Sequence, residues 1–156
     1  MNEFEWFDNL YKGDIKKVLH TVSGGTDSAL TLFIHCKYIV DNNLSTEIHT
    51  YNDCDTNCPP TPKLAFLEIF KYIKNKFPSV KFYDPVTKDL DYSLEHFGKI
   101  RKTYENSYMT TNSIDFKIGG VTMSPPEDIR IMYQMDDTVT AGRNNPRYHL
   151  PFTHVN

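Results

Sequence analysis

Apolar residues recur along the chain at two different spacings, and each spacing predicts one kind of element. Short apolar runs bounded by turn residues predict strands, over residues 16–22, 47–51, 80–83 and 114–118. Longer segments with apolar side chains three and four positions apart predict helices, over residues 27–41, after Pro62, over about 90–108 and from Pro126. A short helix or arm is predicted within residues 1–14.

Turn residues set the expected boundaries of these elements. The stretch 52–60 is rich in Asn, Asp and Pro and is predicted to be a turn after the second strand. The third strand is predicted to stop at Asp84-Pro85, because proline removes a ladder donor and restricts the residue before it. From Asp136 onward the chain is polar and shows no period, which is typical of a lid or a docked tail.

Strands that alternate with helices predict right-handed crossovers and a mainly parallel, twisted sheet covered on both faces. The expected fold is therefore a three-layer α/β sandwich of the Rossmann-like type. One domain is expected, with a nucleotide-binding part over residues 1–136 and a polar tail or lid over residues 137–156 that belongs to the same domain.

Composition narrows the class of protein. The 156 residues carry a net charge of -3, which gives no electrostatic case for a general nucleic-acid or membrane binder. The acidic N-terminus does not resemble a signal peptide, and no apolar run is long enough to span a bilayer. The chain has three cysteines, and this odd number argues against a disulfide framework. We therefore expect a cytoplasmic protein.

The most informative segment is the loop Ser23-Gly24-Gly25-Thr26-Asp27-Ser28, which lies between the first strand and the first long helix. Two adjacent glycines let the backbone turn sharply and present its N–H groups to an anion, and the hydroxyl groups add further donors. The positive end of the following helix points at the same place. The loop is therefore predicted to bind the phosphates of a nucleotide.

Two more loops are expected near the same place. The loops after Tyr51 and after Ile118 also follow strands, and the carboxyl ends of parallel strands lie at one edge of a sheet. Ligands in such sheets bind beyond that edge, where the strand order reverses. The three loops are expected to converge on one pocket.

The pattern Ser-Gly-Gly-x-Asp-Ser resembles the signature of the PP-loop (N-type) ATP pyrophosphatases, the adenine nucleotide alpha-hydrolase-like superfamily, and the chain matches all five fixed positions over Ser23–Ser28. The Walker loop and the dinucleotide fingerprint are both absent. The resemblance implies that ATP, with Mg²⁺, is cleaved between the α and β phosphates. An oxygen of the substrate is adenylated and pyrophosphate leaves.

The resemblance also assigns roles within the loop. Gly24, Gly25 and Thr26 would hold the pyrophosphate through backbone N–H groups. Ser23 and Ser28 would donate hydroxyl hydrogen bonds, and Asp27 would hold Mg²⁺ or cap the helix. We take Ser23, Asp27 and Ser28 as the catalytic candidates.

The resemblance further places the end of the second strand near the adenosine, which makes Thr50, Tyr51, Asn52 and Asp53 candidate nucleotide contacts. Asp53 is also a candidate Mg²⁺ ligand, with a turn-forming aspartate as the alternative. Gly120 and Thr122 lie in a segment that looks like the substrate-side loop of small phage-encoded members, and a plain strand-to-helix connection is the alternative.

The cysteines, histidines and cations outside the glycine loop give weaker indications of function. Cys54 and Cys58 lack enough partners for a metal site, and sulfur transfer would require activated thiols. His20 and His35 are predicted to be structural. Four cations are placed by chain order to meet phosphates, although each alone is more often a surface charge: Lys63, Arg130, Arg143 and Arg147.

The acceptor is left open by the sequence. No glutaminase domain and no accessory cysteine cluster of the better-known branches is present. An AMP-forming enzyme that adenylates a small molecule or a nucleobase is the leading hypothesis. The alternatives are sulfonucleotide metabolism and a non-catalytic protein that binds or sequesters adenine nucleotides. A homodimer is a further possibility that the sequence leaves open.

Overall fold

The computed structural model describes residues 3–119 and 148–149. The elements in chain order are α1 (Glu3–Leu10), β1 (Lys17–Thr21), α2 (Thr26–Asp41), β2 (Glu47–Asp55), α3 (Thr61–Lys76), β3 (Lys81–Phe82), β4 (Val86–Leu90), α4 (Phe97–Thr111), β5 (Phe116–Gly119) and β6 (Tyr148–His149). Among these helices none has both the length and the apolar content needed to cross a bilayer.

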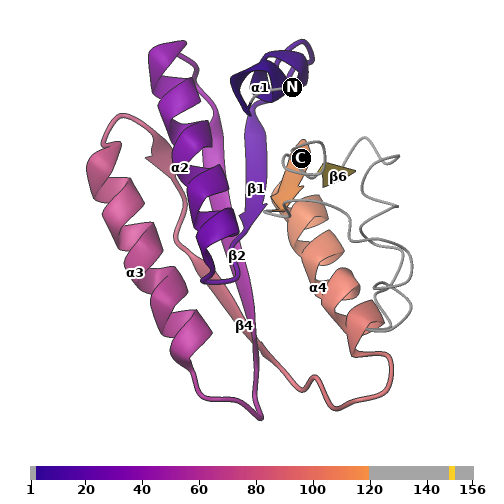
Figure 1. Cartoon of the computed structure of the whole chain (residues 1–156). Helices are drawn as coiled ribbons and strands as arrows, with labels where there is room; N and C mark the ends of the chain where they lie inside the picture. Colours follow the sequence, from indigo (N-terminus) through magenta and orange to yellow (C-terminus); the bar gives the residue numbers. More distant parts are fainter. Residues whose placement is uncertain (1–2, 120–147, 150–156) are drawn as a thin grey trace, which may run out of the picture.

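The strands form one parallel sheet in the order β3-β2-β1-β5-β6, and β4 also pairs with β2. The chain moves outward from β1 to β2 and β3, and later returns to place β5 on the other side of β1 (Figure 1). The strand order therefore reverses at β1. The register sets Thr21 beside Tyr51 on one side and beside Gly119 on the other.

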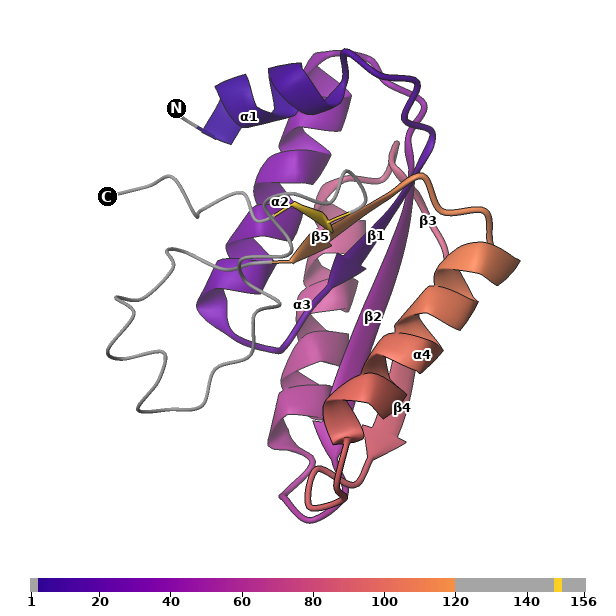
Figure 2. The ribbon, with the colours of Figure 1, turned by 90° about the vertical axis from the view of Figure 1, so that its right-hand side faces the viewer.

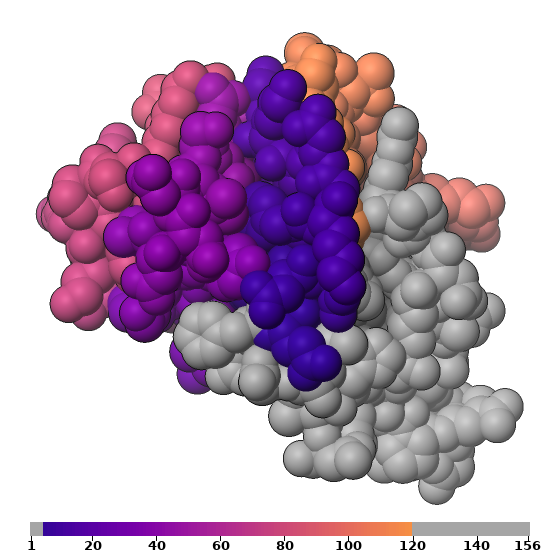
Figure 3. Space-filling model, turned by 90° about the horizontal axis from the view of Figure 1, so that it is seen from above, coloured from indigo at the N-terminus to yellow at the C-terminus, as the bar shows by residue number. Residues whose placement is uncertain are grey.

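Helices cover both faces of this sheet. The helices α2 and α3 lie on one face and α4 lies on the opposite face (Figure 2). Seen from above, the indigo N-terminal residues lie between the magenta and the orange parts of the molecule (Figure 3). The three-layer α/β sandwich predicted from the sequence is confirmed.

Two hydrophobic clusters fill the layers. The larger cluster includes Trp6 and Phe7 of α1, which pack with the side of the sheet that faces α2 and α3. The smaller cluster joins Leu19 and Tyr51 of the sheet to Met109 in the last turn of α4 and to Ile114 in the connection to β5. Because side chains alternate along a strand, neighbouring residues of β1 and β2 belong to different layers.

The second strand is longer than the sequence predicts. It continues through the polar residues 52–55, which were expected to form a turn, and ends at Asp55. The reason is a partner strand, since Tyr51 through Asp55 pair with Val86 through Leu90 of β4. Parallel pairing satisfies the backbone of these polar residues, which local preference alone would place in a turn.

The strand β4 is not predicted from the sequence. The predicted stop at Asp84-Pro85 is correct for β3, but pairing along the same edge of β2 resumes at Val86. The following helix consequently begins at Phe97 rather than near residue 90. The two-residue strand β6 was also not predicted. The helix predicted from Pro126 lies outside the described residues.

Two buried histidines connect α2 to the sheet. His20 Nε2 lies 2.7 Å from His35 Nδ1, and His35 Nε2 lies 2.7 Å from the Tyr11 hydroxyl. Tyr11 in turn contacts the Thr46 hydroxyl at 2.9 Å. Both imidazoles are fully buried and satisfied by neighbours. This is the structural role predicted for them.

This pair predicts a loss of stability in mild acid. Burial lowers the pKa of His20 to about 3, and burial followed by the nearby His20 lowers the pKa of His35. The unfolded chain takes up protons below a pKa of about 6.5, whereas the folded chain does not. The free energy of unfolding should therefore fall as the pH is lowered from about 6.5 to about 5. Urea denaturation across this range measures the slope.

A matched pair of variants tests the assignment. His20→Gln should flatten the slope, because one of the imidazoles with a lowered pKa is gone. His96→Asn is the matched control, because it replaces an exposed histidine with a residue that tolerates the left-handed backbone found there and keeps the His20–His35 pair. An unchanged slope in His20→Gln would contradict the assignment.

Candidate functional site

The loop Ser23–Gly25 joins the end of β1 to the start of α2, at the strand where the order reverses (Figure 2). This is the position at which open parallel sheets bind ligands. The Val22 N–H donates to the Tyr51 carbonyl at 2.8 Å, so β2 fixes the point where the chain leaves the sheet. The predicted relation of strand, loop and helix is therefore present.

Gly24 occupies a place that only glycine fits well. Its φ is +87°, in the left-handed region, and an added Cβ would lie 2.6 Å from the Pro62 carbonyl oxygen. That oxygen belongs to the backbone of the first turn of α3, so it cannot move aside as a flexible side chain would. The loop therefore packs closely against the start of α3, in addition to leading into α2.

Two serine hydroxyls hold the loop from within. The buried Ser28 hydroxyl accepts from the Ser23 N–H and donates to the Gly25 carbonyl, both at 3.2 Å. The Gly25 N–H donates to the Ser23 hydroxyl at 3.2 Å, and the two hydroxyls also lie 3.2 Å apart. In this structure both groups shape the loop, and the exposed Ser23 is the one that also faces outward.

The positive end of α2 has no side-chain cap. The helix begins at Thr26, and its N-cap residue is Gly25, which has no side chain to accept a hydrogen bond from the first turn. The alternative in which Asp27 caps the helix is therefore wrong. The exposed Asp27 carboxylate stands in the first turn, beside the N–H groups that have no partner inside a helix. An anion suits the end of α2 both electrostatically and as an acceptor.

The Asn52 side chain holds the residue just before the loop. Its Nδ2 donates to the Val22 carbonyl at 2.7 Å, and its side chain is 2% exposed. Asn52 Oδ1 and the equally buried Thr50 Oγ1 have no hydrogen-bond partner within the described part of the chain. Both residues belong to the set of β2 that points toward α2 and α3. Asn52 holds the residue just before the loop, and neither buried side chain lines an open surface.

Tyr51 and Asp53 point toward the other layer. Asp53 accepts a hydrogen bond from the Tyr92 hydroxyl and lies 3.8 Å from Arg101 Nε. It pairs with Lys88 in the middle of the β2–β4 ladder, so it does not stand at a free strand end. The four candidates of the second strand are therefore divided between two faces. The structure does not bring their side chains into one pocket.

Of the two candidate Mg²⁺ ligands, Asp27 and Asp53, only Asp27 has surroundings that suit the ion. Asp27 is exposed beside the loop and could share an ion with phosphate oxygens and water, as Mg²⁺ prefers. Asp53 is already engaged by a hydroxyl and a guanidinium and does not fit this role. Within residues 3–119 and 148–149, no group of three His, Cys, Asp or Glu side chains is arranged to hold a metal ion.

The remaining candidates divide between described and undescribed residues. Lys63 lies on α3 and pairs with Asp89 at 3.2 Å. The residues that lie outside the described ranges are Gly120, Thr122, Arg130, Arg143 and Arg147. The pocket contribution expected from the loop after Ile118 stays a prediction for that reason.

Cys54 belongs to β2 and only Cys58 lies in the loop after it, so the two thiols differ in their surroundings. Cys54 is buried. The exposed Cys58 thiol donates to the Asp55 carboxylate, and this contact raises the pKa of Cys58. A raised pKa means less thiolate, which is the reactive form. The sulfur-transfer role is not favoured by this environment.

No protein-family model and no curated protein sequence matches the chain. Solved structures do match. The tRNA thiolase NcsA from Methanococcus maripaludis, determined with its 4Fe–4S cluster, is 12% identical with a TM-score of 0.61. An NAD+ synthetase from Burkholderia pseudomallei is 13% identical with a TM-score of 0.58. Each match covers 97% of this chain and 59% of the other.

At these identities the likeness shows a shared fold. This chain spans somewhat more than half the length of either protein, so it matches one part of each. They share the α/β fold that the alternation of strands and helices predicts for this chain.

The close approach of Gly24 to α3 predicts a strong effect of a single methyl group. Gly24→Ala should lower the free energy of unfolding by about 1–3 kcal/mol, because alanine is strained at this φ and its Cβ meets a backbone oxygen. Gly98→Ala is the matched control, since nothing lies within 4 Å of its Cβ. It should be neutral or stabilising by up to about 1 kcal/mol. Urea denaturation compares the two, and equal effects would contradict the geometry.

Proposed function

We propose that this chain binds ATP at the Ser23–Ser28 loop and, with Mg²⁺, cleaves it to AMP and pyrophosphate by adenylating an oxygen of an acceptor. The observation that carries the proposal is the uncapped start of α2 behind a glycine loop, at the strand where the sheet order reverses. The presence of a tRNA thiolase and an NAD+ synthetase among the proteins with this fold supports it.

In this proposal the loop binds the leaving group. The N–H groups of Gly24 and Thr26 receive the β and γ phosphates. The Gly25 N–H, which donates to the Ser23 hydroxyl in the free loop, turns to the phosphates when they bind, and the Ser23 hydroxyl adds a donor from the exposed side. Asn52 and Ser28 act as positioning residues, because each holds the loop through a backbone atom. A loop fixed before the nucleotide arrives needs little reorganisation as charge develops.

The reaction itself asks for little covalent chemistry from the protein. An acceptor oxygen attacks the α-phosphorus, the bond from that phosphorus to the bridging oxygen breaks, and pyrophosphate leaves with the electron pair. Bound Mg²⁺ would neutralise the charge that gathers on the phosphate oxygens. Asp27 is the residue proposed to hold that ion.

The role of Asp27 is tested by its dependence on the metal. Asp27→Asn should weaken binding of ATP by about tenfold or more when Mg²⁺ is present, and should have little effect in EDTA, because the lost charge acts through the ion. Titration calorimetry measures both conditions. The control is Asp41→Asn, which removes a carboxylate at the opposite end of the same helix, where Lys37 pairs with it.

The products distinguish the proposed reaction from its alternatives. Incubation with ATP and a panel of small carboxylates, followed by chromatography, should yield AMP and pyrophosphate. ADP and phosphate as products would contradict the proposal. Tight binding of ATP with no AMP for any acceptor would favour a binding or sequestering protein. Preference for a sulfated adenine nucleotide over ATP would favour sulfonucleotide metabolism.

A further inference from the structure

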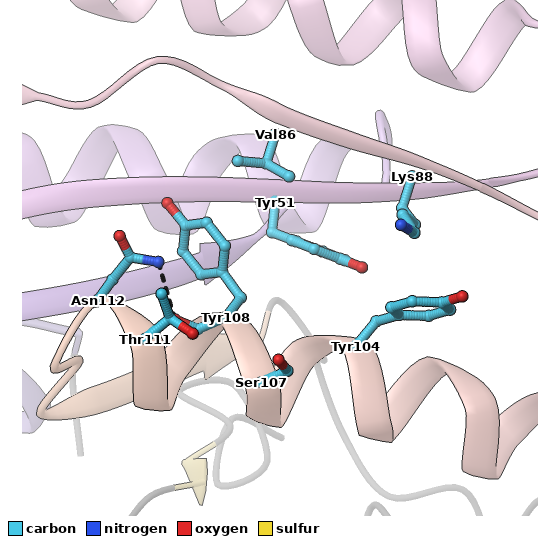
Figure 4. A pocket seen from close by; sticks show the side chains of 8 residues that line it. All are labelled: Tyr51, Val86, Lys88, Tyr104, Ser107, Tyr108, Thr111 and Asn112. Carbon is cyan, nitrogen blue, oxygen red and sulfur yellow. Dashed lines mark hydrogen bonds between the residues drawn. The ribbon is translucent and has the colours of Figure 1, made fainter.

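A second cleft lies on the other face of the sheet from α2, between the β2–β4 edge and α4. Its volume is about 270 Å³, and its walls come from Tyr51 on β2, Val86 and Lys88 on β4, and Tyr104 and Tyr108 on α4 (Figure 4). The small polar residues Ser107, Thr111 and Asn112 continue the α4 wall. None of these α4 residues belongs to the glycine loop or to its supports.

The three tyrosine hydroxyls of this cleft are in different situations. The Tyr108 hydroxyl lies 2.7 Å from His49 Nδ1 and is satisfied by it. Tyr104 is 41% exposed, so water can reach its ring. Tyr51 is 3% exposed and extends along the wall of the cleft toward Lys88 and Tyr104 (Figure 4); its hydroxyl is buried and has no hydrogen-bond partner among the described residues. A buried hydroxyl without a partner is costly, typically by about 1–3 kcal/mol.

The electrostatic surroundings define what the Tyr51 hydroxyl can bind. Burial, and after it the carboxylates of Asp53 and Glu105, raises the pKa of Tyr51 to about 12. The phenol therefore keeps its proton near neutral pH and can donate a hydrogen bond to an acceptor atom of a ligand.

Lys88 supplies the second polar group, at the same end of the cleft. Its ammonium lies 4.1 Å from the centre of the Tyr104 ring, so one side chain from each wall meets there (Figure 4). The Tyr104 ring is the partner of this ammonium among the described residues, and a ring face at a partly exposed site binds a cation weakly, at about 0.5–1 kcal/mol. The flexible lysine can therefore swing aside and turn its charge to an incoming anion.

We propose that this cleft binds a small planar aromatic carboxylate, with the carboxylate between the Tyr51 hydroxyl and the Lys88 ammonium and the ring against Tyr104, Tyr108 and Val86. A donor and a cation side by side match a carboxylate, and tyrosine faces with an aliphatic neighbour match a flat ring. The volume suits one ring, since it lies below the range of about 300–1,000 Å³ for larger ligands. The proposal does not rest on the ATP reaction.

Ligand-observed saturation-transfer NMR without nucleotide tests the chemistry directly. Benzoate is the probe, benzamide keeps the shape without the charge, and benzylamine reverses the charge. Benzoate should bind more tightly than benzamide, and benzylamine should not bind. Absence of benzoate binding at millimolar concentration, or equal binding of benzylamine, would overturn the proposal.

Two variants test the residues. Tyr51→Phe should weaken benzoate binding by about fivefold or more, and Lys88→Met should weaken benzoate binding while leaving benzamide binding unchanged. Tyr72→Phe, at a tyrosine that is 61% exposed on α3, is the matched control and should change nothing. Unchanged benzoate affinity in Tyr51→Phe would refute the site.

The Tm of Tyr51→Phe distinguishes a ligand-binding hydroxyl from a structural one, because the two roles change Tm in opposite directions. If the hydroxyl serves a ligand, its removal from the free protein relieves an unsatisfied group, and Tm should stay level or rise by about 2–4 °C. A fall of several degrees would mean that the hydroxyl has a structural partner, and the proposal would then be wrong.

Discussion

The pairing of β2 with its neighbours is the constraint on which both sites depend. Its first five residues pair with β1 and its last five pair with β4, and the two ladders meet at Tyr51. The register against β1 puts the Tyr51 carbonyl at Val22, where the glycine loop begins. Alternation along the strand then sends Asn52 toward the loop and Tyr51 toward α4. A shift of one residue would exchange these two side chains.

The elements that the sequence predicts well are those whose signal is local. Helices α2 and α3 carry apolar side chains at helical spacing, and Ser23–Ser28 carries its own turn chemistry. The end of β2 is different, because Asn52 and Asp53 are turn-forming residues by preference and extend only because β4 pairs with them. Because Pro85 interrupts the strand pattern, the sequence does not predict β4. The pairing that extends β2 is therefore not predicted either.

The same hidden strand explains the errors about side chains. Tyr51 was placed beside a nucleotide because the strand was expected to end there, whereas the structure has it near the centre of a longer strand. The cleft that Tyr104 and Tyr108 of α4 line with Lys88 of β4 has no signal in the sequence either, because it depends on where β4 lies. The contact of Gly24 with Pro62 also has no local signal, since it depends on where α3 begins in space.

The break at Asp84-Pro85 also bears on how copies of this chain can meet. A long, flat edge strand offers unpaired N–H and C=O groups to a strand of another molecule, and natural sheets avoid this with prolines, charges and short strands. Here β3 has two residues, a proline without an N–H separates it from β4, and Lys81, Lys88 and Asp89 lie along the two segments. Growth of the sheet from one molecule into the next is therefore blocked at this edge. Any assembly that forms on this side has to use helices and side chains rather than a continuous backbone ladder.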